Sequence, residues 1–279
     1  MMNKERFKAR LRKMLILGIK QFSDPYYQGF AAQIAFFMML SLVPLMIVVS
    51  QLLGILDVSL NLMNQTIDKY LAPGVADTLK GILNSGATST GNNIFFILMA
   101  LWAASRAQFA MMRIANYTYT SGRRTGNFWT ERFRSWRTMF LSVFTYAFVI
   151  IILVYGKMIL TLMFGQIVHG SMIDLAWTYL RWPLAAILFF LMVFYTYYVL
   201  PQEKLEPRDV VPGSIGASIG LLVVTFFYSI YVNYIANFNI IYGTMASVVA
   251  LMFWFYFLSW VMVLGILFNK VWRDTRGEY

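Results

Sequence analysis

The chain has 279 residues, of which 59% are hydrophobic and only 13% are charged. Soluble domains carry about 25% charged residues, so this chain has too few charges to cover a water-facing surface. The composition therefore predicts an integral membrane protein and disfavours the soluble enzymes. The absence of Cys excludes disulfides and thiolate metal sites, and a single His disfavours zinc. The sequence has neither a P-loop nor a GxGxxG fingerprint, so no cofactor is expected.

Residues 1–24 are predicted to form an amphipathic helix that lies on an anionic membrane surface. Lys and Arg side chains share this segment with apolar side chains at helical spacing. Ser23-Asp24-Pro25 then ends the helix and caps the next element. The apolar positions are Phe7, Leu11, Met14, Leu15 and Phe22.

Residues 25–270 form the predicted transmembrane domain, an all-α bundle of six helices. Each span needs ~20 apolar residues to cross the hydrocarbon core. Residues 57–92 are the one long connection, predicted to hold short external amphipathic helices, and residues 271–279 form a cytoplasmic tail. The predicted spans are about 29–55, 93–115, 138–162, 177–200, 211–235 and 244–269.

The distribution of the 23 basic residues predicts the orientation of the chain. Eighteen of them fall in segments that lie on one side of a six-span arrangement, and three fall on the other. The positive-inside rule then places both termini in the cytoplasm. Topology and attraction to anionic lipid account for the net charge of +11, so no nucleic-acid partner is required.

Arg106 is the main functional candidate, because it lies well inside the second predicted span. A central Arg costs ~2.5–3.5 kcal/mol on insertion scales, so it must face the bundle interior or a wet cavity. The guanidinium either holds an anionic group such as a phosphate or extends to the cytoplasmic headgroups. For Arg113, nearer the interface, the second interpretation is favoured. The other candidate substrate-binding residues on this span are Ser105, Gln108, Arg113 and Asn116.

Polar residues of two other spans complete the candidate substrate site. Gln33 lies in the first span, where Pro44 removes a backbone hydrogen bond and is expected to kink the helix. Asn233 lies in the polar outer half of the fifth span and Asn237 follows it, and both are candidates for an outward-facing vestibule. An interfacial aromatic belt is the alternative explanation of that region.

Several small or aromatic residues are predicted to have structural roles. Gly213, Gly216 and Gly220 include a GxxxG pattern, which favours close helix packing over a pore. Gly243 and Trp254 are assigned to packing as well, as is Pro44. No Asp or Glu falls inside a span core, which disfavours proton-coupled transport.

An ordered set of short matches resembles the YihY/BrkB family of bacterial membrane proteins, once named ribonuclease BN. The resemblance implies a multi-pass protein of the bacterial cytoplasmic (inner) membrane with six helices, linked to envelope integrity and serum resistance. Where the last span of the family usually carries an acid, this chain has Leu267, two residues before Asn269. The matching stretches are Ala31–Pro44, Leu101-Trp102 with Ser105-Arg106, Asn116-Tyr117, Pro212-Gly213 and Tyr242-Gly243-Thr244.

The first functional hypothesis is a transporter or translocation factor for an amphipathic anionic molecule, such as a lipid or lipid-linked envelope component. The alternative is a non-transporting envelope scaffold that contacts membrane lipids and an envelope partner protein or forms a homo-oligomer. A continuous polar cavity that reaches Arg106 favours transport, and an apolar core favours a scaffold. A nuclease is disfavoured, because the chain lacks a His pair and clustered carboxylates; no enzyme activity is expected.

Overall fold

The computed structural model describes residues 12–20, 22–55, 77, 80–81, 93–120, 127–164, 170–234 and 244–276. Within these ranges the structure is helical and contains no strand, which confirms the all-α prediction for this part of the chain. Residues 12–20 are helical, as predicted for the N-terminal segment. The six long helices are α2 (Pro25–Ile55), α5 (Asn93–Thr120), α6 (Phe128–Phe164), α7 (Gly170–Val199), α8 (Pro207–Tyr234) and α10 (Thr244–Arg276).

Each of the six predicted spans overlaps one of these helices. In the described ranges, three segments are long and apolar enough to cross a membrane by length and composition alone. They are Trp182–Val199 in α7, Pro207–Tyr231 in α8 and Val248–Arg276 in α10. The external connection 57–92 lies outside the described residues, apart from residues 77, 80 and 81.

Several helices extend beyond the spans predicted for them. The 37 residues of α6 begin at Phe128, ten residues before the predicted span. At 1.5 Å per residue such a helix is about 55 Å long, well over the ~30 Å of the hydrocarbon core. Much of the predicted connection between the second and third spans is therefore helical, as continuations of α5 and α6.

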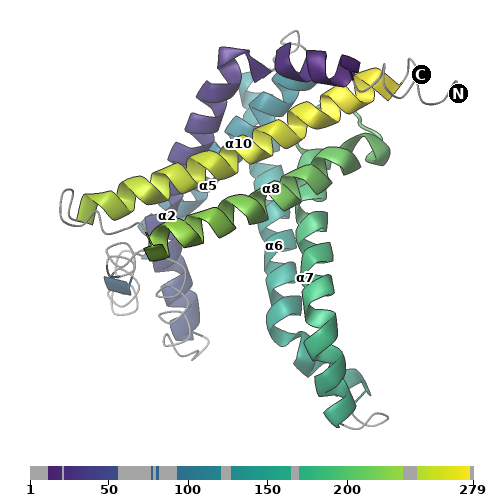
Figure 1. The fold of residues 1–279 in the computed structure, drawn as a ribbon. Coiled ribbons are helices and arrows are strands. Elements are labelled where there is room, and N and C mark those ends of the chain that lie inside the picture. The colour runs from purple at the N-terminus through teal and green to yellow at the C-terminus, as the bar shows by residue number, and fades with distance from the viewer. Residues whose placement is uncertain are drawn as a thin grey trace, which may run out of the picture.

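The helices pack as pairs (Figure 1). In the view shown, α6 and α7 descend together as a hairpin, whereas α8 and α10 run side by side across the other helices. α2 packs on α5, and α10 contacts both of them. The core contains small, fully buried residues, among them Ala31 on α2 and Ala110 and Ala115 on α5. Small side chains let helices approach closely, which is how membrane helices gain van der Waals contact.

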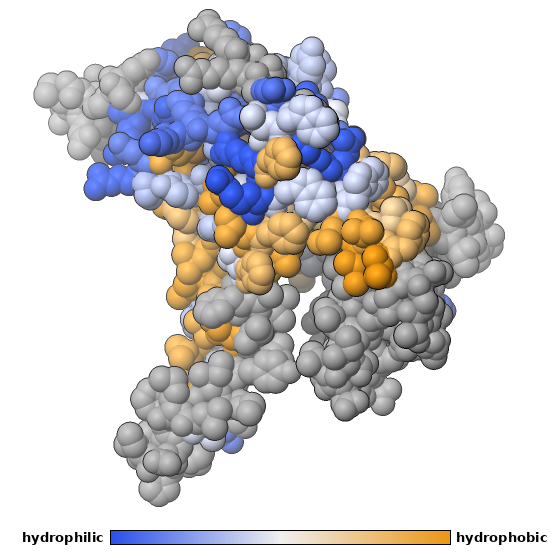
Figure 2. All heavy atoms as spheres, turned by 180° about the vertical axis from the view of Figure 1, so that it is seen from behind, coloured by the Kyte–Doolittle hydropathy of each residue, from blue (hydrophilic) through white to orange (hydrophobic). Residues whose placement is uncertain are grey.

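The surface separates into a hydrophilic end and an apolar body (Figure 2). Hydrophilic residues gather at the upper end in this view, and hydrophobic residues dominate the described surface below it. Large apolar side chains are exposed on the long helices, including Trp182 on α7 and Phe226 on α8. Exposed apolar surface on this scale is unfavourable in water and typical of helices that face lipid.

Charged side chains fasten the hydrophilic end. Arg134 of α6 donates hydrogen bonds to the carbonyls of Val199 and Leu200, both at 3.2 Å, and to that of Pro201. These carbonyls lie where α7 ends, and a cation there is favoured by the helix dipole. At the end of α10, Arg273 pairs with Glu203 at 2.5 Å. The short loop between α7 and α8 is thereby held from two sides.

The three glycines of α8 differ in the space around them. A Cβ at Gly213 would collide with the backbone of Gly265 and with Asn269, and a Cβ at Gly220 would lie 2.8 Å from Val261. A Cβ at Gly216 would meet nothing within 4 Å. The α8–α10 contact is therefore tight on either side of Gly216 and open at Gly216 itself.

Candidate functional site

Arg106 lies at the middle of α5 and is half-buried. Its guanidinium carbon is 4.9 Å from the ring centre of Phe37 on α2 and 6.0 Å from that of Trp102, one turn earlier on α5. The buried Nε atom has no hydrogen-bond partner among the described residues. The charge is therefore held against aromatic rings, which stabilise a cation by their quadrupole, and one donor remains unused.

Arg132 of α6 is a second arginine at this place. Its Nη2 donates a hydrogen bond to the hydroxyl of Ser105 at 3.0 Å, and its buried Nη1 has no acceptor among the described residues. The guanidinium is 5.7 Å from the ring centres of both Phe109 and Trp136. Burial lowers the pKa of Arg132, and the positive charge of Arg106 lowers it further. The two guanidinium groups are thus close enough to repel each other.

Two serines hold α5 and α6 together beside this pair. The hydroxyl of Ser135 donates to the carbonyl of Ser105 at 3.1 Å, and the hydroxyl of Ser105 donates to the carbonyl of Trp102 at 2.8 Å. Both serines are fully buried. The predicted candidate Ser105 therefore positions Arg132, whereas no hydrogen bond to Arg106 is seen. Arg132 itself was counted only as one of the basic residues that set the orientation.

A cavity of about 400 Å³ lies at the junction of α2 and α5. Gln33 and Arg113, which the sequence proposed as site residues, both line it, together with Tyr26 and Phe30. The Arg113 guanidinium is 5.9 Å from the rings of Phe30 and Phe109. Because Phe109 also contacts Arg132, its ring links this cavity to the arginine pair. Arg106 is not one of the six residues that line the cavity.

The arginines at the end of α10 have carboxylate partners, which distinguishes them from the arginines of the candidate site. Arg276 pairs with Asp209 at 3.2 Å, as Arg273 does with Glu203. In the described ranges, Arg106, Arg113 and Arg132 have no carboxylate partner. Arg106 and Arg132 are partly buried and Arg113 is exposed. Positive charge without a countercharge is suited to an external anion.

Other predicted residues are engaged in different contacts. The Asn116 side-chain oxygen accepts a hydrogen bond from the backbone N–H of Gln202 at 2.8 Å, which attaches the α7–α8 loop to α5. Gln108 approaches Ser142 of α6 at 3.5 Å, at the limit of hydrogen bonding. The Asn233 side chain, Asn237 and Gly243 lie outside the described part of the structure.

Two further structural candidates, Pro44 and Trp254, lie within described helices. Pro44 is buried within α2, which continues through it. Trp254 of α10 stacks on Tyr228 of α8 with ring centres 5.0 Å apart. The described residues contain no group of three or more His, Cys, Asp or Glu side chains that could hold a metal ion.

Comparison with known proteins gives one family and two relatives. The family described as Virulence factor BrkB matches residues 19–278. The ribonuclease-like protein YfkH of Bacillus subtilis is 27% identical over 240 residues, which cover 85% of this chain and 87% of YfkH. The UPF0761 membrane protein Nmul_A0452 of Nitrosospira multiformis is 29% identical over 69 residues, 25% of this chain and 16% of that protein. No solved structure matches the chain.

Proposed function

The chain belongs to the BrkB family of membrane proteins, and we propose that it is a transporter or translocation factor for an amphipathic anionic molecule. A lipid or lipid-linked envelope component is the cargo that fits best. The observation that carries this proposal is the pair Arg106 and Arg132. Arg132 donates to Ser105, the chain neighbour of Arg106, and each of the two arginines has one buried donor without a partner among the described residues.

The arginine pair raises the energy of the folded protein when no anion accompanies it. Two like charges in partly buried surroundings raise the energy of the protein, and each unsatisfied buried donor adds about 1–3 kcal/mol. A phosphate or phosphodiester group accepts hydrogen bonds from both guanidinium groups and cancels their repulsion. The rings of Phe37 and Phe109 beside them suit the apolar part of an amphiphile.

The surroundings of the pair support an approach from the hydrophilic end. In the proposed six-span topology both termini are cytoplasmic, so Arg113 and the cavity beside Gln33 would face the inner leaflet. An anionic headgroup that enters there would meet Arg113 first and the arginine pair next. Since the spans carry no Asp or Glu, we favour facilitated movement or a process driven by a partner protein.

The test is lipid movement in liposomes that contain the purified protein. We expect Arg106→Ala and Arg132→Ala to abolish the movement of fluorescent phosphatidylglycerol between leaflets, although both variants still insert. Arg137→Ala is the matched control, because Arg137 is an exposed arginine on the same face of the membrane. Movement at the wild-type rate in both site variants would show that the pair does not handle the cargo.

An envelope scaffold is the second candidate, and one observation favours it. Arg106 is absent from the lining of the cavity at Arg113, so this cavity does not join the two arginines. A scaffold would use the arginines to fix α5, α6 and bound lipid. Crosslinking in intact cells separates the two functions: a stable partner protein together with normal lipid movement in Arg106→Ala would favour the scaffold.

A further inference from the structure

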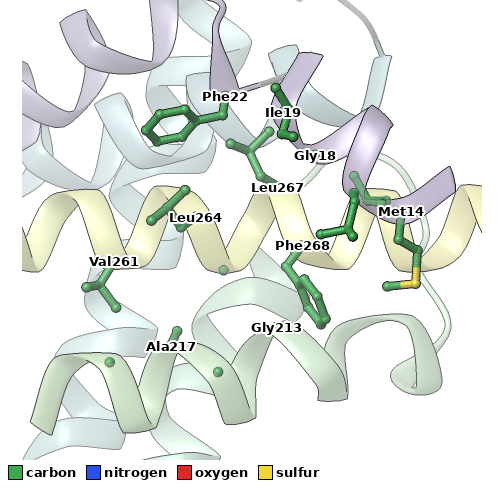
Figure 3. A pocket seen from close by; sticks show the side chains of 15 residues that line it. Met14, Gly18, Ile19, Phe22, Gly213, Ala217, Val261, Leu264, Leu267 and Phe268 are labelled. Carbon is green, nitrogen blue, oxygen red and sulfur yellow. The ribbon is translucent and has the colours of Figure 1, made fainter. Parts of the chain in front are cut away.

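A second cavity of about 540 Å³ lies between the helical segment 12–20, α8 and α10 (Figure 3). Its lining contains no charged side chain, unlike the surroundings of the arginine pair. All fifteen residues that line it are apolar or glycine. Met14 and Ile19 approach from the N-terminal segment, Leu264 and Phe268 from α10, and the glycine run from α8. Nothing in the proposed function uses this groove, which we call the surface-helix groove.

Two glycines on different walls keep the surface-helix groove open. A Cβ at Gly216 of α8 or at Gly18 of the N-terminal segment would meet nothing within 4 Å. The neighbouring Gly213 and Gly220, in contrast, are packed tightly against α10. The segment is anchored at its far end by Phe22, whose ring lies 5.3 Å from that of Trp260. The groove therefore exists because the residues at positions 18 and 216 are glycines, which have no side chain to fill it.

The chemistry of the lining limits what can fill the groove. Buried water needs two to four polar partners, and the lining side chains offer none. An ion, a sugar or a nucleotide would be unpaired there for the same reason. The rim is apolar and exposed, since Leu15, Ile19 and Phe268 are 59%, 66% and 44% accessible. In a membrane protein such a rim opens to lipid, whose hydrocarbon chains can enter.

The basic side chains of the N-terminal segment favour an anionic lipid as the occupant of the groove. At 100° per residue, Lys13 and Lys20 lie on the side of the helix opposite the groove-lining positions 14, 15, 18 and 19. An amphipathic helix with this arrangement lies in the plane of the interface, with its basic side among anionic headgroups. A lipid whose acyl chain lies in the groove and whose headgroup lies near Lys13 and Lys20 would contact both the apolar and the basic side of this helix.

We propose that the surface-helix groove binds one acyl chain of an anionic phospholipid of the inner leaflet. The chain fills the space at Gly216 and Gly18 and joins the N-terminal segment to α8 and α10. Dispersion contacts with the groove hold the chain, because lipid tails gain little hydrophobic energy on leaving other lipid. This inference is independent of the arginine pair and does not rest on the proposed transport function.

The test uses phosphatidylglycerol that carries a photoreactive diazirine in its acyl chain, added to phosphatidylcholine vesicles that contain the full-length protein. In the wild type we expect labelled peptides from residues 12–22 and 261–271. Gly216→Leu places a side chain in the groove and should reduce this labelling several-fold. Gly216→Ala is the matched control, since its single methyl group leaves most of the space open and its labelling should be retained.

Three results would overturn the proposal. Undiminished labelling in both Gly216→Leu and Gly18→Leu would show that the chain lies elsewhere. Equal labelling by a phosphatidylcholine probe would remove the preference for an anionic lipid. A photoreactive amino acid at position 216 that crosslinks to another copy of the chain would instead assign the groove to self-association. Because none of these measurements uses transport, the outcome is separate from that of the arginine variants.

Discussion

The side-chain oxygen of Asn269 accepts a hydrogen bond of 2.6 Å from the backbone N–H of Gly213, and both residues are buried. The contact joins α10 to α8 in the turn where Pro212 interrupts the regular helical hydrogen-bond pattern. Only a glycine lets the backbone of α8 come so close to the Asn269 side chain. One asparagine and one glycine therefore set the distance between these two helices.

This contact predicts opposite effects for two neighbouring glycines. Gly213→Ala inserts a Cβ into Asn269 and the backbone of Gly265, and we expect a loss of about 1–3 kcal/mol or more in unfolding free energy. Gly216→Ala meets no atom and should be neutral or stabilising by up to about 1 kcal/mol, because Ala favours the helix. Denaturant titration of both variants in the same detergent compares them. Equal stabilities would show that α8 and α10 can separate at Gly213 without cost.

Removal of one arginine of the pair should raise the stability of the protein and weaken the binding of an anion. Arg132→Met removes one of two like charges and a buried unsatisfied donor, so we expect a higher Tm in neutral detergent without anions. An anionic amphiphile such as phosphatidic acid at 100 times its Kd should stabilise the wild type by about 2.7 kcal/mol and leave the variant unchanged. Arg137→Met serves as the control and should keep the full response to the lipid. An identical response in Arg132→Met would exclude Arg132 from the anion site.

Tyr117 predicts a pH dependence at the start of α2. Its hydroxyl donates a hydrogen bond of 2.7 Å to Asp24, which raises the pKa of Tyr117 to about 12 from 10.0. A pKa raised in the folded state adds stability below the unfolded value, and this is lost as the pH rises through the folded value. Tyr117→Phe should cost about 0.5–1.5 kcal/mol at neutral pH. The difference from the wild type should fall between pH 10 and about 12.

Chemical or thermal unfolding at a series of pH values would measure this difference. Tyr26→Phe is the matched control, because the ring of Tyr26 lies 5.5 Å from that of Tyr117 and its side chain is exposed. It should lower stability little and show no step in that pH range. A difference between Tyr117→Phe and the wild type that stays constant up to pH 12 would contradict the assigned hydrogen bond.

The six-span topology predicts the labelling of single cysteines, which the absence of native Cys makes straightforward. Lys69→Cys, in the external connection, should react with a membrane-impermeant maleimide in intact cells. Lys204→Cys and Arg276→Cys should react only after the membrane is permeabilised, because the positive-inside rule places them in the cytoplasm. Labelling of Arg276→Cys in intact cells would contradict a cytoplasmic C-terminus.

The sequence alone determined the properties that depend on neighbouring residues in the chain. Long apolar runs reflect the thickness of the hydrocarbon core, and each predicted span overlaps a helix, although several of these helices extend beyond the span. The amphipathic spacing of Met14 and Leu15 contributed to the prediction of a helix within residues 1–24, of which residues 12–20 are described and helical. Arg106 was recognised because a charge inside a single apolar run is costly wherever the run is placed.

Only the tertiary structure decided which distant residues meet. Arg132 lies 26 positions after Arg106, and the packing of α6 on α5 brings the two charges together. Asn116, a site candidate by sequence, is turned by its helix toward the backbone of Gln202. The groove at Gly18 and Gly216 exists because the N-terminal segment, α8 and α10 come together there. Such contacts depend on how helices cross and rotate, and periodicity within one helix carries no information about either.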